Sequence, residues 1–301
     1  MIEQNGNEAL RRSLCALNEE TDALRKHRLF VLSELAEDLT EEMRQRLSED
    51  EMPSLDPASL RRTVEEKALP EYLPFLREGG EDALSADLAA LSVFLAERLG
   101  EAADPVSAWR AARLAQSRVC YVPSTRAEAA YAVCAKEKEN VTVSFAENAE
   151  LGCADLVAEN VDYLLLPYAS ASGSRLVSTE RLVDRYDLYT AATVCLPEEE
   201  GDVIYGLFSA RSTPFVEKGE MQLSLRFTVD SYSHLGRMLT AFSALGFAVG
   251  ELSTSDEDYG RVASKAVLRE SGNYAALWLY LCLYAGSFSF LGWYPRLSAE
   301  N

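Results

Sequence analysis

The order of strand and helix patterns between residues 221 and 294 constrains this fold more than any other sequence feature. Six segments there read as strand, helix, strand, strand, helix and strand: 221–230, 232–246, 247–254, 261–269, 273–286 and 288–294. The strand segments favour apolar and β-branched residues, and both helical segments stop at a glycine. The order βαββαβ predicts a ferredoxin-like module, which usually binds a small ligand or pairs with a copy of itself.

The pattern upstream of this module changes at Asp104-Pro105. Residues 1–104 show only helical patterns, the clearest at 10–39, 55–76 and 83–99. Residues 105–220 alternate between strands and helices, which is typical of an α/β layer. The expected strands are 118–122, 141–145, 161–167, 188–196 and 203–210, and the expected helices are 127–136, 146–159 and 179–186. The sequence therefore predicts a multidomain α+β protein with domains at 1–104, 105–220 and 221–301.

The composition argues against several classes of partner. The net charge of −19 repels phosphate backbones and anionic lipids, so neither nucleic acid nor a membrane surface is an expected partner. No apolar run reaches the ~20 residues of a membrane span. The polar start, MIEQNGNEAL, is unlike a secretory signal, so we expect a cytoplasmic protein. The six cysteines show no CxxC spacing and the chain has two histidines, which predicts reduced, mostly buried thiols, no metal site and no cofactor.

Three stretches of the sequence resemble one family of enzymes. The motif Leu291-Gly-Trp-Tyr-Pro295 is similar to the last strand of the ACT domain at the end of prephenate dehydratases. VDYLLLPYASASGS resembles the dehydratase loop that usually reads Leu-Pro-Ile-Glu-Asn-Ser, and LRRSLCALNEETDALRKHRLFVLSELAEDL resembles the first helix of the helical chorismate mutases. In this order they resemble the bifunctional chorismate mutase–prephenate dehydratases, or P-proteins, of phenylalanine biosynthesis. The resemblance implies a helical mutase-like domain, a short dehydratase-like α/β domain and a C-terminal ACT-like domain.

The mutase chemistry needs cations that hold two carboxylates and a developing negative charge. The resemblance aligns Arg11 and Arg28 with the family's two helix-one arginines and Asp56 with an aspartate of the second helix, and it implies that these three are catalytic. The family's lysine falls on Leu39, and its arginine and glutamate become Ser59 and Leu60. The alternative interpretation is that the two arginines are solvated charges on a helix face.

The dehydratase motifs are also depleted. The loop with Glu-Asn-Ser becomes Tyr168-Ala-Ser-Ala171, and the Thr-Arg-Phe strand becomes Val203-Ile-Tyr205. We therefore expect no dehydratase activity. Polar residues that remain near these loops are Ser124, Thr125, Arg126, Ser170, Ser172, Ser174 and Arg175. Of these, Thr125, Arg126, Ser170 and Ser172 are the candidates for ligand binding. Ser172-Gly-Ser174 could form a small anion-binding nest with Arg126 or Arg175 near it, or it could be an ordinary flexible loop.

The ACT-like segment carries two further candidates, because the family's ligand-binding turn falls on Tyr232-Ser233-His234-Leu235. Ser233 and His234 could contact an amino acid. Alternatively, His234 has a purely local partner and the module pairs with a second copy without ligand. The long apolar stripe on 10–39 also favours a homodimer, because one domain of this size cannot cover it.

The favoured hypothesis is a divergent P-protein relative with impaired catalysis and a ligand-binding or regulatory role. Its candidate ligands are chorismate, prephenate or an aromatic amino acid. Two alternatives remain open at this point. One is a functional chorismate mutase with a divergent site, and the other is a non-enzymatic regulator of amino-acid metabolism with an ACT domain.

Overall fold

The computed structural model describes most of the chain. The described residues are 2–46, 74, 76–100, 104–106, 117–170, 174–197, 202–257, 260–269 and 272–298. They form two compact units, one of residues 1–103 with 275–284 and the other of residues 104–274 with 285–301. The predicted helix at 55–76 lies, apart from Pro74 and Leu76, outside the described residues. The predicted domain boundaries stay predictions.

The described part of the first unit consists of helices. They are α1 (Ile2–Arg46), α4 (Gly80–Leu99) and nearly all of α10 (Tyr274–Tyr284). Helix α1 is longer than predicted, because residues 7–46 contain no glycine or proline to stop it. Helix α1 packs against α4, and among its described side chains the buried apolar ones lie in its last third, Leu35 and Leu39 among them. A buried hydrogen bond of 2.9 Å joins the hydroxyls of Ser85 on α4 and Tyr280 on α10.

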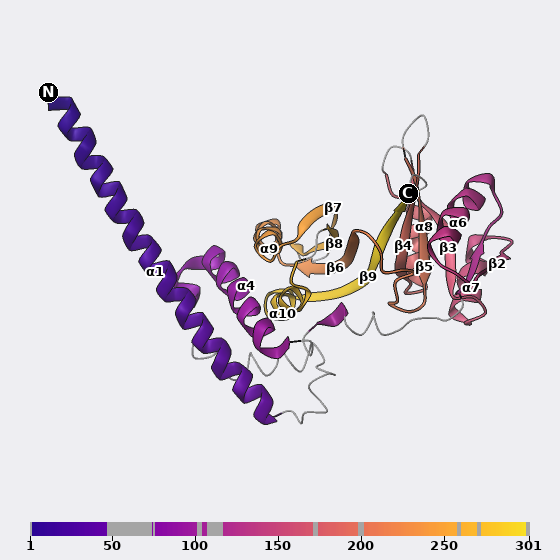
Figure 1. Ribbon diagram of the computed structural model, residues 1–301, viewed down its shortest axis with the longest axis horizontal. Helices are drawn as coiled ribbons and strands as arrows, with labels where there is room; N and C mark the ends of the chain where they lie inside the picture. The colour runs from indigo at the N-terminus through magenta and orange to yellow at the C-terminus, as the bar shows by residue number, and fades with distance from the viewer. Residues whose placement is uncertain are drawn as a thin grey trace. The chain divides into compact units, whose positions relative to one another are not determined.

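In the second unit, the described residues form a mixed sheet of nine strands in the order β2-β1-β3-β5-β4-β9-β6-β8-β7 (Figure 1). The strands are β1 Ser117–Tyr121, β2 Val141–Phe145, β3 Tyr163–Ala169, β4 Tyr189–Leu196, β5 Val203–Ser209, β6 Met221–Val229, β7 Ala248–Asp256, β8 Val262–Arg269 and β9 Ser287–Ser298. The helices of this unit are α6 Thr125–Glu137, α7 Ala149–Val157, α8 Val177–Arg185 and α9 Tyr232–Ala244. The elements follow the predicted order, and the fold is a mixed α/β fold.

Strand β3 is the centre of the first half of this sheet. It pairs in parallel with β1 and antiparallel with β5. Its residues alternate between two buried clusters, because successive side chains of a strand point to opposite faces. Tyr163 and Leu165 pack with α6, whereas Leu164 and Leu166 pack with α7. The apolar run at 161–167 is therefore buried on both faces, as its composition predicts, although its sheet is mixed rather than parallel.

The second half of the sheet has the strand order β9-β6-β8-β7, which is antiparallel throughout. Side chains of β6 divide between its faces. Phe227 packs edge-on against Phe242 of α9, at 5.8 Å between ring centroids. The opposite face of β6 carries the polar residues that alternate with its apolar ones, namely Gln222, Ser224 and Arg226. On that face, Asp184 of α8 is ion-paired with Arg226, which fastens α8 to this half.

Strand β9 joins the two halves into one sheet. It extends to Ser298, beyond the predicted end at residue 294, because Arg296–Ser298 pair in parallel with Thr193–Cys195 of β4. The motif that resembles the ACT domain lies at this junction. Gly292 has φ 148° and Trp293 donates a hydrogen bond of 3.2 Å to the Tyr274 hydroxyl. Tyr294, next in the motif, is buried.

Candidate functional site

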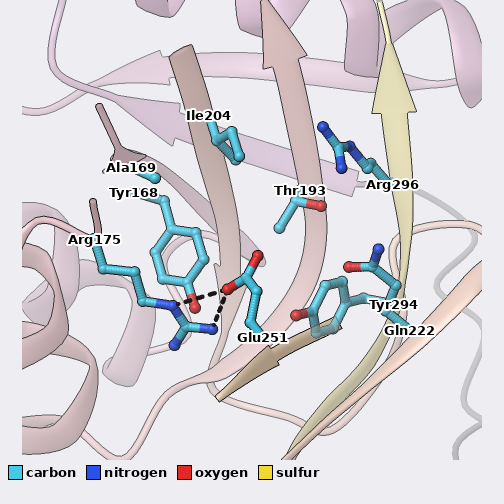
Figure 2. Close-up of a pocket in the computed structure, with 9 residues that line it drawn as sticks. All are labelled: Tyr168, Ala169, Arg175, Thr193, Ile204, Gln222, Glu251, Tyr294 and Arg296. Atoms are coloured by element: carbon cyan, nitrogen blue, oxygen red, sulfur yellow. Dashed lines mark hydrogen bonds and ion pairs between the residues drawn. The ribbon is translucent and has the colours of Figure 1, made fainter. Parts of the chain in front are cut away.

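A small polar cavity of about 80 Å³ lies in the second unit, where both halves of the sheet contribute side chains (Figure 2). The lining residues come from six strands and from the segment between β3 and α8: Tyr168, Ala169, Arg175, Thr193, Ile204, Gln222, Glu251, Tyr294 and Arg296. Strand pairing brings six of these lining residues together in three pairs: Ala169 with Ile204, Thr193 with Arg296, and Gln222 with Tyr294.

Arg175 is the most firmly held charge in the cavity. Its Nη2 and Nε donate to Oε2 of Glu251 at 2.7 and 3.2 Å, and its Nη1 lies 3.5 Å from Oε1 of Glu180. Its guanidinium also lies over the ring of Tyr168, 5.0 Å from the centroid. Burial alone would lower the pKa of Arg175, but the Tyr168 and Glu251 oxygens outweigh it and raise the pKa. The side chain is therefore a fixed cation whose charge Glu251 neutralises.

The two phenols beside it keep their protons at neutral pH. Burial raises the pKa of Tyr168 to about 12, although the nearby charge of Arg175 opposes the shift. Burial raises the pKa of Tyr294 well above its usual value. Both hydroxyls can therefore donate hydrogen bonds to a ligand, but neither is suited to give up a proton in catalysis.

Arg296 provides a second guanidinium, which lies farther from its polar neighbours than Arg175 lies from Glu251. Its Nη2 lies 3.5 Å from the sulfur of Cys195 and 3.7 Å from Oδ2 of Asp202. The Cys195 thiol itself donates to Oδ2 of Asp202 at 3.0 Å. Burial, together with Asp202, raises the pKa of this thiol, so it stays protonated. Arg296 is therefore oriented by its neighbours without being saturated by a bidentate carboxylate.

The predicted ligand-binding residues lie at three places in this unit. Thr125 and Arg126 begin α6 and are exposed, and Ser233 and His234 lie in the first turn of α9. None of these four lines the cavity. Ser170 follows the lining residue Ala169, and its N–H donates to the carbonyl of Ser174 at 3.0 Å. Ser172 lies outside the described residues.

Of the predicted mutase residues, only Arg28 has a described side chain. It forms a bidentate ion pair with Asp87 of α4, with Nε 2.8 Å from Oδ1, and Asp87 is buried. Arg11 lies in α1, where its side chain is not described, and Asp56 lies outside the described residues. A role for these three in binding chorismate stays a prediction.

Sequence reasoning missed most of the cavity. Thr193, Gln222, Glu251, Tyr294 and Arg296 were not among the candidates, although each is polar and lies on a strand. One signal was present. Polar residues alternate with apolar ones along β6, which indicates that one face of this strand meets a polar environment.

The described residues give no sign of a metal site or of a membrane segment. Among them, no group of three or more His, Cys, Asp or Glu side chains is placed to hold a metal ion. Within the same residues, no helix has the length and hydrophobicity that crossing a membrane requires. All six cysteines are free thiols, and five of them are buried.

Comparison with known proteins finds similar structures but no similar sequence. No protein-family model matches the chain, and no curated protein matches it. A quorum-quenching acylase, GqqA, is 13% identical with a TM-score of 0.47, and the match covers 59% of this chain and 94% of the acylase.

Two prephenate dehydratases are similar to the same degree. The enzyme from Streptococcus mutans is 13% identical with a TM-score of 0.48, covering 61% of this chain and 100% of that one. The enzyme from Arthrobacter aurescens, in complex with L-Phe, is 10% identical with a TM-score of 0.48, covering 60% of this chain and 90% of that one. Solved structures similar to this chain therefore include prephenate dehydratases, at low identity and partial coverage.

Proposed function

We propose that this chain is a divergent relative of the P-proteins that binds a small metabolite in the polar cavity and has little or no catalytic activity. The observation that carries the proposal is the position of Ala169 and Ile204. The resemblance aligns the first with a glutamate and the second with an arginine of the dehydratase motifs. The two residues pair across β3 and β5, and both line the cavity.

The cavity therefore lies where the resemblance puts the dehydratase chemistry, but two of the groups that chemistry would use are absent at the aligned positions. Loss of the substrate's hydroxyl and carboxylate needs an acid near the hydroxyl. The phenols of Tyr168 and Tyr294 hold their protons too tightly for that role. Charged and hydrogen-bonding groups remain, and these support binding and orientation of a ligand.

The helical unit likewise indicates that the mutase reaction is impaired. Arg28 is the one predicted mutase arginine whose side chain is described, and both of its ion-pairing nitrogens face Asp87. A chorismate carboxylate would have to displace this buried carboxylate and leave it unpaired, which is costly. We therefore favour a ligand-binding or regulatory role in amino-acid metabolism over a functional mutase.

A binding panel combined with two activity assays tests this proposal. Chorismate, prephenate, phenylalanine, tyrosine and tryptophan are added to the full chain, together with shorter amino acids. A ligand present at 100 times its dissociation constant should raise the free energy of unfolding by about 2.7 kcal/mol, which a thermal-shift assay detects. No phenylpyruvate should form from prephenate, and no prephenate from chorismate, above the uncatalysed rates.

Either of two results contradicts the proposal. One is turnover of prephenate or chorismate that scales with protein concentration and is lost on mutation of a cavity residue or of Arg28. The other is the failure of every compound in the panel to stabilise the protein. The matched control is Glu150→Gln, which removes an exposed ion pair with Arg185 outside the cavity and should leave ligand binding unchanged.

A further inference from the structure

Besides the ion pair of Arg175 with Glu251, the lining of the polar cavity offers a ligand the second carboxylate oxygen of Glu251 and the guanidinium of Arg296. Glu251 accepts both hydrogen bonds from Arg175 on Oε2, which leaves Oε1 directed toward the interior of the cavity (Figure 2). The Arg296 guanidinium enters from the other side, toward Thr193 (Figure 2). We propose that the cavity binds the zwitterionic form of an α-amino acid with a short side chain. This inference rests on the proposed binding function and names the class of its ligand.

The charged groups of the lining determine where each end of such a ligand would bind. Its ammonium group would donate to Oε1 of Glu251, and its carboxylate would accept from Arg296. Arg175 cannot take the carboxylate without giving up Glu251, to which it already donates twice. Arg296 meets its neighbouring carboxylate only at 3.7 Å, so a ligand carboxylate can replace that contact at a shorter distance.

The charge of the whole protein favours a zwitterion over an anion. The chain carries a net charge of −19, and its field opposes the approach of a further anion such as a dicarboxylate. A zwitterion has no net charge, so this long-range repulsion does not act on it. The cavity selects it by short-range pairing of both charges, while the buried amide of Gln222 and the Thr193 hydroxyl provide uncharged polar contacts.

The size of the cavity limits the side chain of the ligand. A volume of about 80 Å³ holds only a few water molecules. Glycine, alanine or serine fits such a space, whereas phenylalanine requires the lining side chains to move. Ala169 and Ile204 provide the apolar part of the lining, against which a methyl group can pack.

Isothermal titration calorimetry on the full chain tests the assignment with ligands that differ in one charge. The probes are L-alanine, with both charges, propionate, with only the carboxylate, and ethylamine, with only the ammonium. We expect L-alanine to bind and both single-charge probes to bind at least 10-fold more weakly. Glu251→Gln and Arg296→Gln should each weaken L-alanine binding about 10–150-fold, as expected for loss of a charge-assisted hydrogen bond. Glu150→Gln should not change it.

The outcomes separate this inference from the proposed function. If phenylalanine, prephenate or chorismate binds and glycine, alanine and serine do not, the ligand class is wrong while the binding function stands. Equal affinity for L-alanine and propionate also overturns it, because the ammonium would then contribute nothing. If no compound binds, both proposals fail. Because Glu251→Gln also removes the partner of Arg175, circular dichroism must show that each variant is folded, and Arg296→Gln gives an independent reading.

Discussion

Gly292 of β9 lies directly against the backbone of Thr190 at the start of β4. A Cβ atom at residue 292 would come within 2.2 Å of the Thr190 carbonyl oxygen, closer than any real contact of this kind. Gly292 also has φ 148°, which side-chain-bearing residues rarely adopt. The glycine of the Leu-Gly-Trp-Tyr-Pro motif is therefore required at the irregularity in the β6–β9 pairing, where β9 passes the start of β4.

Gly292→Ala should therefore destabilise the second unit. Backbone strain at a disallowed φ and overpacking each typically cost about 1–3 kcal/mol. Urea denaturation should show a lower midpoint for this variant. The control is Gly236→Ala on the exposed face of α9, where no atom lies within 4 Å of the added Cβ. Alanine in a helix should stabilise that site by about 0.5–1 kcal/mol. Equal stability of the Gly292→Ala variant and the unmodified protein would contradict the close approach.

The ion pair of Asp162 with Arg118 makes a pH-dependent contribution to stability. Burial of Asp162 would raise its pKa, but hydrogen bonds from the Arg118 side chain and backbone N–H outweigh burial and lower the pKa below 3.8. A carboxylate with a lowered pKa in the folded state stabilises the protein above its unfolded-state pKa. This contribution is lost as the pH falls below about 3.8 toward the lower folded-state pKa.

The test compares Asp162→Asn with the unmodified protein by urea denaturation at a series of pH values. At pH 6 the variant should be the less stable of the two, and the difference should shrink as the pH falls through the range below 3.8. Arg185→Gln, which removes an exposed ion pair with Glu150 away from Asp162, controls for a general loss of charge. A difference that stays constant or grows on acidification would show that Asp162 does not titrate as a paired carboxylate.

The helices and strands of this chain could be predicted because each has a local periodic pattern in the sequence. The cavity could not be predicted, because it depends on pairing between strands that are distant in the sequence. The run 161–167 is apolar because β3 is covered on both faces, and its composition alone carries that information. By contrast, the pairing of Arg296 with Thr193 joins residues that are distant in the sequence, and no periodic pattern records it. The cavity depends on that pairing, so its residues were not predicted, although the strands that carry them were.

Glu251 shows most clearly why a residue of the cavity could not be recognised from the sequence alone. It lies on β7, an edge strand whose side chains are mostly exposed, and a glutamate on an exposed strand is an ordinary observation. Only its ion pair with Arg175, located 76 positions earlier in the chain, gives it a place in a site. Similarly, Arg28 matches a family arginine in sequence, and only the structure shows that Asp87 holds it.

The pairing of Arg28 with Asp87 predicts a measurable coupling in the helical unit. Asp87 is buried, so Asp87→Ala should destabilise the protein by removing a buried, hydrogen-bonded carboxylate. Arg28 is partly exposed, and solvent screening reduces the value of the pair to about 1–2 kcal/mol. A double-mutant cycle of Arg28→Ala and Asp87→Ala, measured by urea denaturation, isolates that coupling. Coupling close to zero would mean that Arg28 is a solvated surface charge.

The N-terminal half of α1 predicts that the protein is a homodimer. Leu14, Leu17 and Leu24 are 59%, 58% and 71% exposed, and their spacing of three and seven places them along one face of the helix. Leucines recurring in this way are typical of the seam between two supercoiled helices. We therefore expect a second copy of α1 to cover this face. Light scattering during size-exclusion chromatography should give about twice the monomer mass of 33.3 kDa.

Charge introduced on this face should separate the copies. Leu17→Glu with Leu24→Glu would place acidic groups on both sides of the expected seam, where their repulsion and desolvation oppose pairing. This variant should elute at the monomer mass and remain helical by circular dichroism. Val157→Glu, on an exposed position of α7, is the matched control and should keep the oligomeric state unchanged. A monomer mass for the unmodified chain at tens of micromolar would refute the dimer. A dimer that survives the double substitution would place the interface elsewhere.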